Sequence, residues 1–256
     1  MKLKTALILM ICLQLLFCAT SQTKLEKARE KDPRYQYNMG LFYLNSSQLD
    51  LSINHLKKSL SLDPKNYLAF NALGLAYSLK GDLKEAVKYY TECIRLNPSL
   101  SEAHNNLGSV YQEMELYDKA EEEFLAASLD TQYSSRELPF YNLARLYVIQ
   151  EKTQEALFQV QKALEMKPDF VLALNLRGKI YVQLDQLDRA IASFEEAKEM
   201  DPNDVNLNYN LAEAYFKNRQ FQKAKQLFNA IYLKVTDPEM KKRIEEYLAE
   251  IKLPGV

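Results

Sequence analysis

The chain has 256 residues, with 33 lysines and arginines against 34 aspartates and glutamates, and a formal net charge of −1 at pH 7. This balance argues against a nucleic-acid-binding protein, because such proteins need a basic face. Hydrophobic residues make up 47% of the chain, while glycines are few and tryptophan is absent, a composition that suits an all-helical protein.

Residues 1–21 have the features of an export signal. Lys2 and Lys4 precede an apolar run from Ala6 to Phe17, and this run is too short for a membrane-spanning helix, which needs roughly 20 apolar residues. Cys18 follows the run directly, and small residues come after it. This arrangement resembles the lipobox of bacterial lipoproteins, in which the cysteine becomes the lipidated first residue of the mature protein.

The resemblance to a lipobox implies that Cys18 carries a lipid anchor. The residue after the cysteine is Ala19 and not an aspartate, which resembles the signal that sorts Gram-negative lipoproteins to the outer membrane. The expected location is therefore the outer membrane, facing the periplasm. Phe17 departs from the pattern, which has a small residue there. Cleavage after Ser21 is the alternative and would give a soluble periplasmic or secreted protein. Residues 22–32 are expected to be a linker.

A period of 34 residues runs from residue 33 to residue 238. Its most regular feature is a glycine or alanine followed three places later by tyrosine, in the pairs Gly40/Tyr43, Gly74/Tyr77, Gly108/Tyr111, Ala144/Tyr147, Gly178/Tyr181 and Ala212/Tyr215. The second half of each unit has a small residue followed four places later by a large apolar one, and a proline closes most units. The units are 33–66, 67–100, 101–136, 137–170, 171–204 and 205–238.

The spacing predicts two helices in each unit. Residues three and four apart share one face of a helix, so Leu73, Gly74 and Tyr77 form one stripe. The glycine or alanine lets the paired helix approach closely, and the closing proline cannot continue the helix. The pattern is that of the tetratricopeptide repeat. This resemblance predicts an all-α fold, a right-handed α-solenoid of six repeats that forms one continuous domain.

The third unit breaks the period, because it extends over residues 101–136 and lacks the closing proline. We expect Asp130 or Ser128 to cap backbone N–H groups at this break, since helix ends leave such groups unpaired. We expect Tyr133 to pack against the third and fourth units and to set the angle between the two halves. With Arg136, these residues form the candidate linker site. A flexible two-residue insertion is the alternative.

Residues 237–252 are predicted to form a final helix. Asp237 and Pro238 are a helix-start signal, and Ile244 and Tyr247 belong to a set of apolar residues at helical spacing. We expect this helix to cap the C-terminal end of the solenoid, as terminal repeats need a polar outer face. A helix that docks a partner is the alternative.

The first helix of each unit supplies candidate protein-binding residues. In tetratricopeptide repeats these helices line the concave face, and the residues selected on that basis are Tyr37, Leu41, Leu44, Asn71, Leu75, Leu79, Asn105, Tyr141, Arg145 and Ile149. Leu41, Leu75 and Leu79 are expected to be at least about a third exposed and to form, with Tyr37 and Leu44, an apolar strip that docks an apolar segment of a protein partner. The alternative is that neighbouring helices or residues 22–32 partly cover the strip.

No catalytic, cofactor or metal site is expected. The two histidines, His55 and His104, have no cysteine at ligand spacing, and no phosphate-binding loop or catalytic motif occurs. The acidic run from Glu121 to Glu123 is interpreted as a solvated face, because adjacent residues on a helix point in different directions. The chain is therefore predicted to be a scaffold and not an enzyme, with no nucleic acid or small-molecule substrate among its partners.

The sequence around the break resembles one particular family. Residues 127–136 read Ala-Ser-Leu-Asp-Thr-Gln-Tyr-Ser-Ser-Arg and lead to Phe140-Tyr141-Asn142-Leu143. A similar run joins the third and fourth repeats in the PilF/PilW family of type IV pilus lipoproteins, also called pilotins. This resemblance implies an outer-membrane lipoprotein that helps a secretin subunit of the pilus to reach the membrane and assemble. The alternatives are a general periplasmic or cell-envelope scaffold unrelated to pili and an accessory subunit of an envelope enzyme, which has no residue in its favour.

Overall fold

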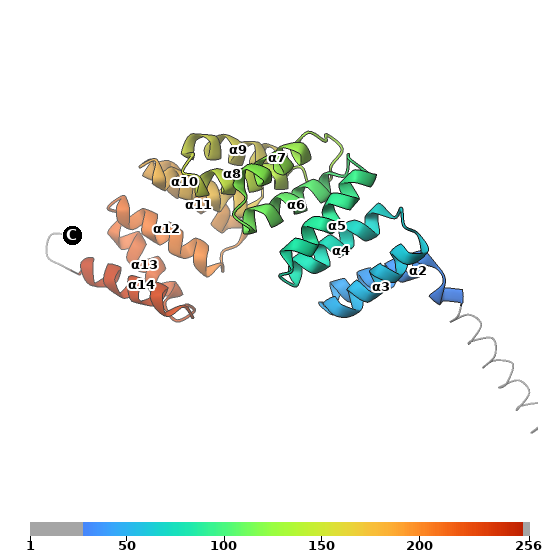
Figure 1. Ribbon diagram of the computed structural model, residues 1–256. Helices are drawn as coiled ribbons and strands as arrows, with labels where there is room; N and C mark the ends of the chain where they lie inside the picture. Colours follow the sequence, from blue (N-terminus) through green and yellow to red (C-terminus); the bar gives the residue numbers. More distant parts are fainter. Residues whose placement is uncertain (1–27, 253–256) are drawn as a thin grey trace, which may run out of the picture. The chain divides into compact units, whose positions relative to one another are not determined.

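The computed structural model describes residues 28–252, in which helices follow one another with short turns (Figure 1). From residue 33 onward the described chain has thirteen helices and no strand. The helices are α2 Pro33–Asn45, α3 Leu49–Leu62, α4 Tyr67–Leu79, α5 Leu83–Leu96, α6 Ser101–Glu113, α7 Tyr117–Ser128, α8 Glu137–Ile149, α9 Thr153–Met166, α10 Val171–Gln183, α11 Leu187–Met200, α12 Val205–Lys217, α13 Phe221–Ile231 and α14 Pro238–Glu250. Each of the six predicted repeats contains two of these helices, and the all-helical repeat fold predicted from the period is confirmed.

The helices fall into two compact units. Unit 1 ends at Glu115 and contains α2 to α6, and unit 2 begins at Leu116 and contains α7 to α14. The division lies inside the third repeat, between α6 and α7, and the prediction of one continuous domain stays a prediction. Since α7 packs against α8, it belongs with the helices of the later repeats.

The turn inside each repeat depends on one residue with a left-handed backbone. This residue comes two places after the first helix and is Ser47, Gly81, Glu115, Glu151, Asp185 or Arg219, with φ between 56° and 81°. A left-handed residue ends a helix by turning the chain away from the helix axis. Glycine adopts this conformation most easily, yet five of the six turns use another residue.

In unit 1 the glycine of a repeat faces a large side chain of the paired helix. A Cβ placed on Gly40 would lie 2.5 Å from Leu56 Cγ, and one placed on Gly74 would lie 2.6 Å from Tyr90 Cδ1. Carbon atoms in contact are about 3.5–4.0 Å apart, so both helix pairs need glycine at their present separation. Leu56 and Tyr90 are buried. The predicted close approach of the paired helices is confirmed.

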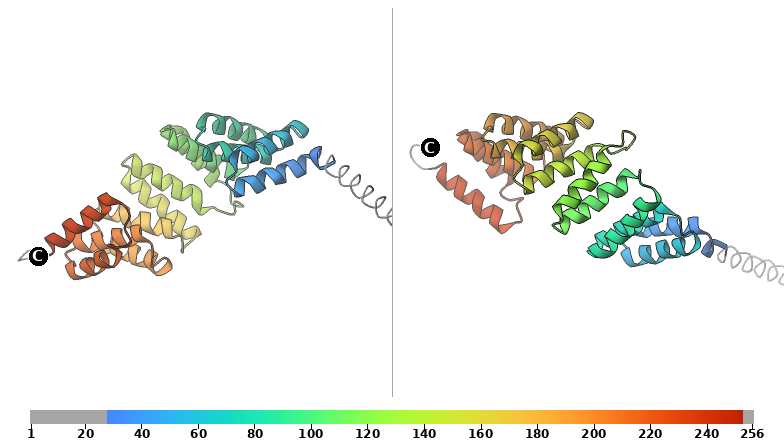
Figure 2. Two further views of the ribbon diagram at one scale, coloured as in Figure 1. Left: turned by 90° about the horizontal axis from the view of Figure 1, so that it is seen from below. Right: turned by 45° about the horizontal axis from the view of Figure 1, so that its top comes forward.

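Unit 2 uses the same packing and ends in a capping helix. A Cβ on Gly178 would collide with the Phe194 ring. At the C-terminal end, α14 lies against α13 (Figure 2). The Tyr247 ring stacks on the Phe228 ring with centroids 5.1 Å apart, and Ile244 is fully buried. Helix α14 therefore covers apolar side chains of the last repeat.

One polar residue of unit 2 stands at a core position of the repeat. Arg177 occupies the place that leucine holds in four other repeats. Its Nε donates to Ser193 Oγ at 3.0 Å, and its Nη2 donates to Glu196 Oε2 at 2.5 Å. Polar contacts therefore join α10 to α11 at a position where four other repeats have leucine.

Tyr147 makes a contact in unit 2 whose strength depends on pH. Its hydroxyl on α8 donates to Glu121 Oε1 on α7 at 2.7 Å. Burial, together with the bond to Glu121 and its charge, raises the pKa of Tyr147 to about 12. A tyrosine in an unfolded chain has a pKa of about 10, so the folded state holds this proton more tightly. The resulting stability is complete below about pH 10 and is lost as the pH rises toward 12.

We therefore expect the free energy of unfolding to decrease between about pH 10 and pH 12, and to decrease less in the variant Tyr147→Phe. Urea denaturation at several pH values across this range measures the effect. Tyr117→Phe, on the same helix as Glu121, is the matched control. An equal change of slope in both variants would contradict the role assigned to Tyr147.

Candidate functional site

In unit 1, the first helix of each of the first two repeats, α2 and α4, carries the apolar residues selected from the sequence. Leu79 on α4 is 60% exposed, as predicted. Tyr37 and Leu41 on α2 and Leu75 on α4 are partly buried and pack against the core. Leu44 is 8% exposed and belongs to the core, because it packs with apolar residues of α3 and α4. Its prediction as a surface residue is wrong, and the apolar strip is narrower than expected, with Leu79 as its most exposed member.

The two asparagines selected in unit 1 are buried. Asn71 on α4 and Asn105 on α6 are 7% and 5% exposed, so the prediction that they line an open surface is wrong. Asn71 Nδ2 donates to Glu102 Oε1 on α6 at 3.1 Å, because the next repeat covers this amide. Burial raises the pKa of Tyr37, and the charge of Glu102 adds to the effect. Glu102, which was not selected from the sequence, therefore lies near both Tyr37 and Asn71.

In unit 2 the selected residues of α8 stay accessible. Ile149 is 48% exposed, and Arg145 is also exposed. Tyr141 is partly buried, with its ring centroid 5.1 Å from that of Phe170. The Arg145 guanidinium carbon lies 5.8 Å from the centroid of the Tyr141 ring, a cation–π contact that orients the arginine.

Helix α10, which contacts α8, adds two residues to this surface. Leu172 is 55% exposed, and Lys179 is exposed at the position of Arg145 one repeat later. Leu172 was missed from the sequence. Leu172 and Glu102 are each the second residue of their repeat. Choosing the second residue of each repeat as a candidate binding position would therefore have identified both residues from the sequence.

The linker between α7 and α8 is ordered by Asp130. The carboxylate accepts a hydrogen bond from the backbone N–H of Gln132 at 2.8 Å, as predicted for a cap. Ser128 does not share this role, because its hydroxyl donates to the carbonyl of Leu125 at 2.8 Å. Tyr133 is partly buried, and the buried Nε of Arg136 has no hydrogen-bond partner among the described residues. The influence of Tyr133 on the angle between the halves stays a prediction.

Cys18, the rest of the predicted export signal and residues 22–27 of the predicted linker lie outside the described residues. None of the described helices combines the length and the apolar character needed to cross a membrane.

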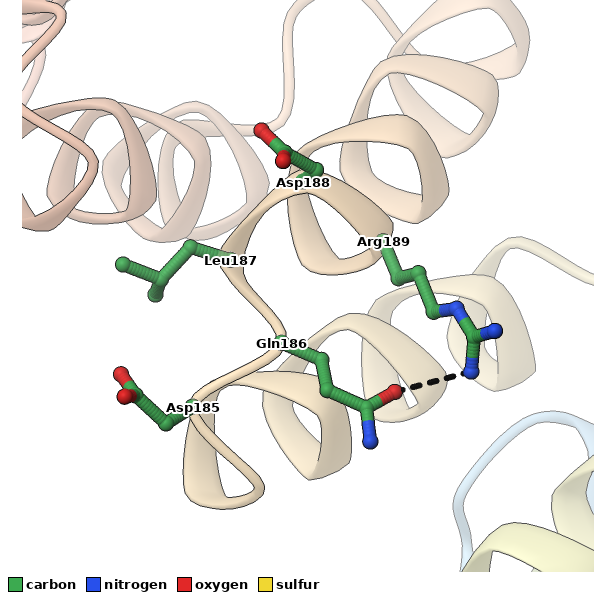
Figure 3. A pocket seen from close by; sticks show the side chains of 5 residues that line it. All are labelled: Asp185, Gln186, Leu187, Asp188 and Arg189. Atoms are coloured by element: carbon green, nitrogen blue, oxygen red, sulfur yellow. Dashed lines mark hydrogen bonds between the residues drawn. The ribbon is translucent and has the colours of Figure 1, made fainter.

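A pocket of about 390 Å³ lies at the turn between α10 and α11 (Figure 3). Five consecutive residues from Asp185 to Arg189 line it, and Arg189 Nη1 donates to Gln186 Oε1 at 2.9 Å. Their side chains do not converge on one point (Figure 3), and none of the selected binding residues is among them. The pocket is therefore a hollow of the turn and offers no arrangement for chemistry.

Metal-binding and nucleophilic groups are sparse in the part of the chain that the structure describes. It contains no group of three or more histidine, cysteine, aspartate or glutamate side chains that could hold a metal ion. Cys93 is buried, and this burial raises the pKa of its thiol to about 11. The thiol therefore stays protonated at neutral pH, and a thiol is far less reactive than a thiolate.

Comparisons with known proteins agree with the repeat fold. Tetratricopeptide repeat models match residues 33–66, 67–100, 89–122, 139–170 and 205–232, and a further TPR repeat model matches residues 178–218. The chain is a tetratricopeptide repeat protein, a class that typically binds other proteins and is typically non-catalytic.

Within this class the chain resembles PilF and PilW. The type IV pilus assembly protein PilF of Pseudomonas aeruginosa is 26% identical over 170 residues, which are 65% of this chain and 68% of PilF. Solved structures of PilF and of PilW, described as a widely conserved type IV pilus biogenesis factor, have the same fold. Their TM-scores are 0.77 and 0.76 at 17% and 15% identity, covering 86% and 83% of this chain and 99% and 98% of those chains.

The similarity also extends to a much larger protein. The human protein O-mannosyl-transferase TMTC3 is 29% identical over 185 residues, which are 67% of this chain but only 20% of TMTC3. The chain thus spans about a fifth of this relative, and the mouse protein of the same name is matched over 19% of its length.

Proposed function

We propose that this chain is a non-catalytic, protein-binding lipoprotein that takes part in type IV pilus assembly at the outer membrane. The observation that carries the proposal is the match to PilF over 68% of PilF's length. Similarity between repeats does not by itself indicate a role in pilus assembly, since TMTC3 matches 67% of this chain and PilF matches 65%. The difference is that TMTC3 is matched over only 20% of its length, whereas most of PilF is matched.

The linker and the surface support the same function. The run at residues 127–136, which resembles the PilF/PilW family, forms a turn in which Asp130 caps a backbone N–H group. Leu79 in unit 1 and Ile149 in unit 2 are exposed apolar side chains, each on the first helix of its repeat. Exposed apolar side chains on such helices provide contact area for a protein segment. We infer that this partner is a secretin subunit of the pilus.

The proposal is tested by deleting the gene in the organism that carries it and restoring either the native gene or Cys18→Ala. Deletion is expected to remove surface pili and secretin multimers from the outer membrane, and the native gene is expected to restore both. The variant is expected to stay in the soluble fraction, to incorporate no labelled palmitate and to restore few multimers, because a protein without its lipid is not held at the membrane. Electron microscopy and immunoblots of membrane fractions measure these outcomes.

Two results would contradict the proposal at different levels. Normal pili after deletion would favour a general envelope scaffold over a pilus protein. A native mature chain that begins at Gln22 would exclude lipidation at Cys18 while leaving a role in pilus assembly intact.

A further inference from the structure

Two adjacent first helices of unit 2 carry unpaired basic side chains at the same repeat position. Arg145 on α8 and Lys179 on α10 are each the ninth residue of their repeat, and both are exposed. Within the described chain neither forms an ion pair. Other lysines of these repeats do, since Lys152 pairs with Glu121 and Lys167 with Glu137.

The next repeat does not neutralise this charge. Its ninth residue is Glu213 on α12, and that carboxylate is already engaged. Glu213 Oε1 accepts a hydrogen bond from the Tyr247 hydroxyl at 3.0 Å and lies 3.3 Å from Lys217 Nζ. Among the described residues, Arg145 and Lys179 therefore form no ion pair, and their positive charge is open to a partner.

Apolar side chains accompany the two charges. Ile149 on α8 and Leu172 on α10 are 48% and 55% exposed. The ring of Tyr141 packs on Phe170 and holds the Arg145 guanidinium above its face, which reduces the conformational entropy that Arg145 would lose on binding. Tyr141, Arg145, Ile149, Leu172 and Lys179 together form what we call the α8–α10 face.

We propose that the α8–α10 face binds an acidic segment of a partner protein that also carries apolar side chains. Carboxylates of the segment pair with Arg145, whose planar guanidinium can hold a carboxylate through two parallel bonds, and with Lys179. Apolar side chains of the segment cover Ile149 and Leu172. An anionic membrane fits less well, because surfaces that bind such membranes gather about 4–8 basic residues and this face presents two. The inference rests on the proposed function only in taking the partner to be the pilus component.

The test uses residues 22–256, which include every residue that the structure describes, and a defined probe. The probe is a fluorescein-labelled synthetic peptide in which glutamates flank leucines, and its partner peptide has glutamine in place of each glutamate. The double variant Arg145→Glu/Lys179→Glu is compared with Arg219→Glu/Lys234→Glu, which changes the net charge equally at exposed residues away from the face. Arg219→Glu suits its turn, because Glu151 has the same left-handed backbone. Circular dichroism checks that both variants are folded.

Fluorescence anisotropy is expected to show that the first variant binds the acidic peptide about tenfold or more weakly, and that the control binds as the native protein does. The glutamine peptide is expected to bind poorly to all three proteins. Equal binding by both variants, or equal binding of both peptides, would overturn the inference. The inference would also be overturned if the native protein bound phosphatidylglycerol vesicles in preference to the peptide and the first variant did not bind the vesicles.

A cell assay separates failure of this inference from failure of the proposed function. If Arg145→Glu/Lys179→Glu restores normal pili to the deletion strain, the α8–α10 face is not the partner site, while the pilus role stands. If deletion itself leaves pili normal, the pilus role fails, and the peptide measurements still decide whether the face binds acidic segments.

Discussion

Replacing Phe228 with alanine is expected to lower the free energy of unfolding of unit 2 by about 3–5 kcal/mol. The side chain is fully buried, and its removal takes away apolar contacts and leaves a cavity. Its ring stacks on Tyr247 of α14 at 5.1 Å and meets Tyr209 of α12 edge-on at 6.0 Å. The substitution therefore weakens the attachment of the capping helix as well as the core of the last repeat.

Urea denaturation measures the loss, and hydrogen exchange of the α14 amides shows whether the cap loosens first. Phe158→Ala is the matched control, since Phe158 is 54% exposed on α9 and surface substitutions usually change stability by only about 0.5 kcal/mol. A loss below about 1 kcal/mol for Phe228→Ala, with unchanged exchange in α14, would show that α14 is not held by this aromatic contact.

If the proposed function is right, replacing Leu79 with glutamate is expected to abolish pilus assembly while leaving the fold intact. Leu79 is 60% exposed, so the change should alter stability by only about 0.5 kcal/mol. A charge at the centre of an apolar contact is costly because it must be desolvated without a partner, and central contacts commonly contribute about 2 kcal/mol or more to binding. Leu75 is a less suitable target, because it packs against the core.

The variant is introduced into the deletion strain, and pili and secretin multimers are counted. Leu51→Glu on α3 is the control, since Leu51 is 42% exposed on a second helix of the repeat. Normal assembly with Leu79→Glu would show that the partner does not use this part of α4. A large decrease in melting temperature would instead place Leu79 in the core.

Much of the fold could be predicted from the sequence because its main contacts are local. Gly74 and Tyr90 are separated by one turn between paired helices, so the period that places them also pairs them. The cap of Asp130 on the N–H group of Gln132 is likewise a contact between near neighbours. Helix periodicity and turn chemistry act over these short distances, and they made such features predictable.

The candidate site was less predictable because exposure depends on neighbouring repeats. Leu44, Asn71 and Asn105 have the spacing of surface residues, yet all three are buried. Leu44 packs in the core with residues of the helices that follow it, and Asn71 donates a hydrogen bond to Glu102 on α6. No residue at the repeat position of Leu172 was selected from the sequence, yet Leu172 is exposed on α10. Spacing assigns a residue to a face of its own helix, but it does not say which side chains of the next helix reach that face.

The sequence by itself determined the repeat, the number of helices from residue 33 onward and the residues at their close contacts, because a strict period repeats the same local packing. Only the tertiary structure decided where the repeats divide into two units and which charges remain without a partner. Glu213 is engaged by Tyr247, 34 residues away on α14, whereas Arg145 and Lys179 find no such partner in the described chain. Ion pairing depends on side chains that meet across helices, and a linear period does not contain that information.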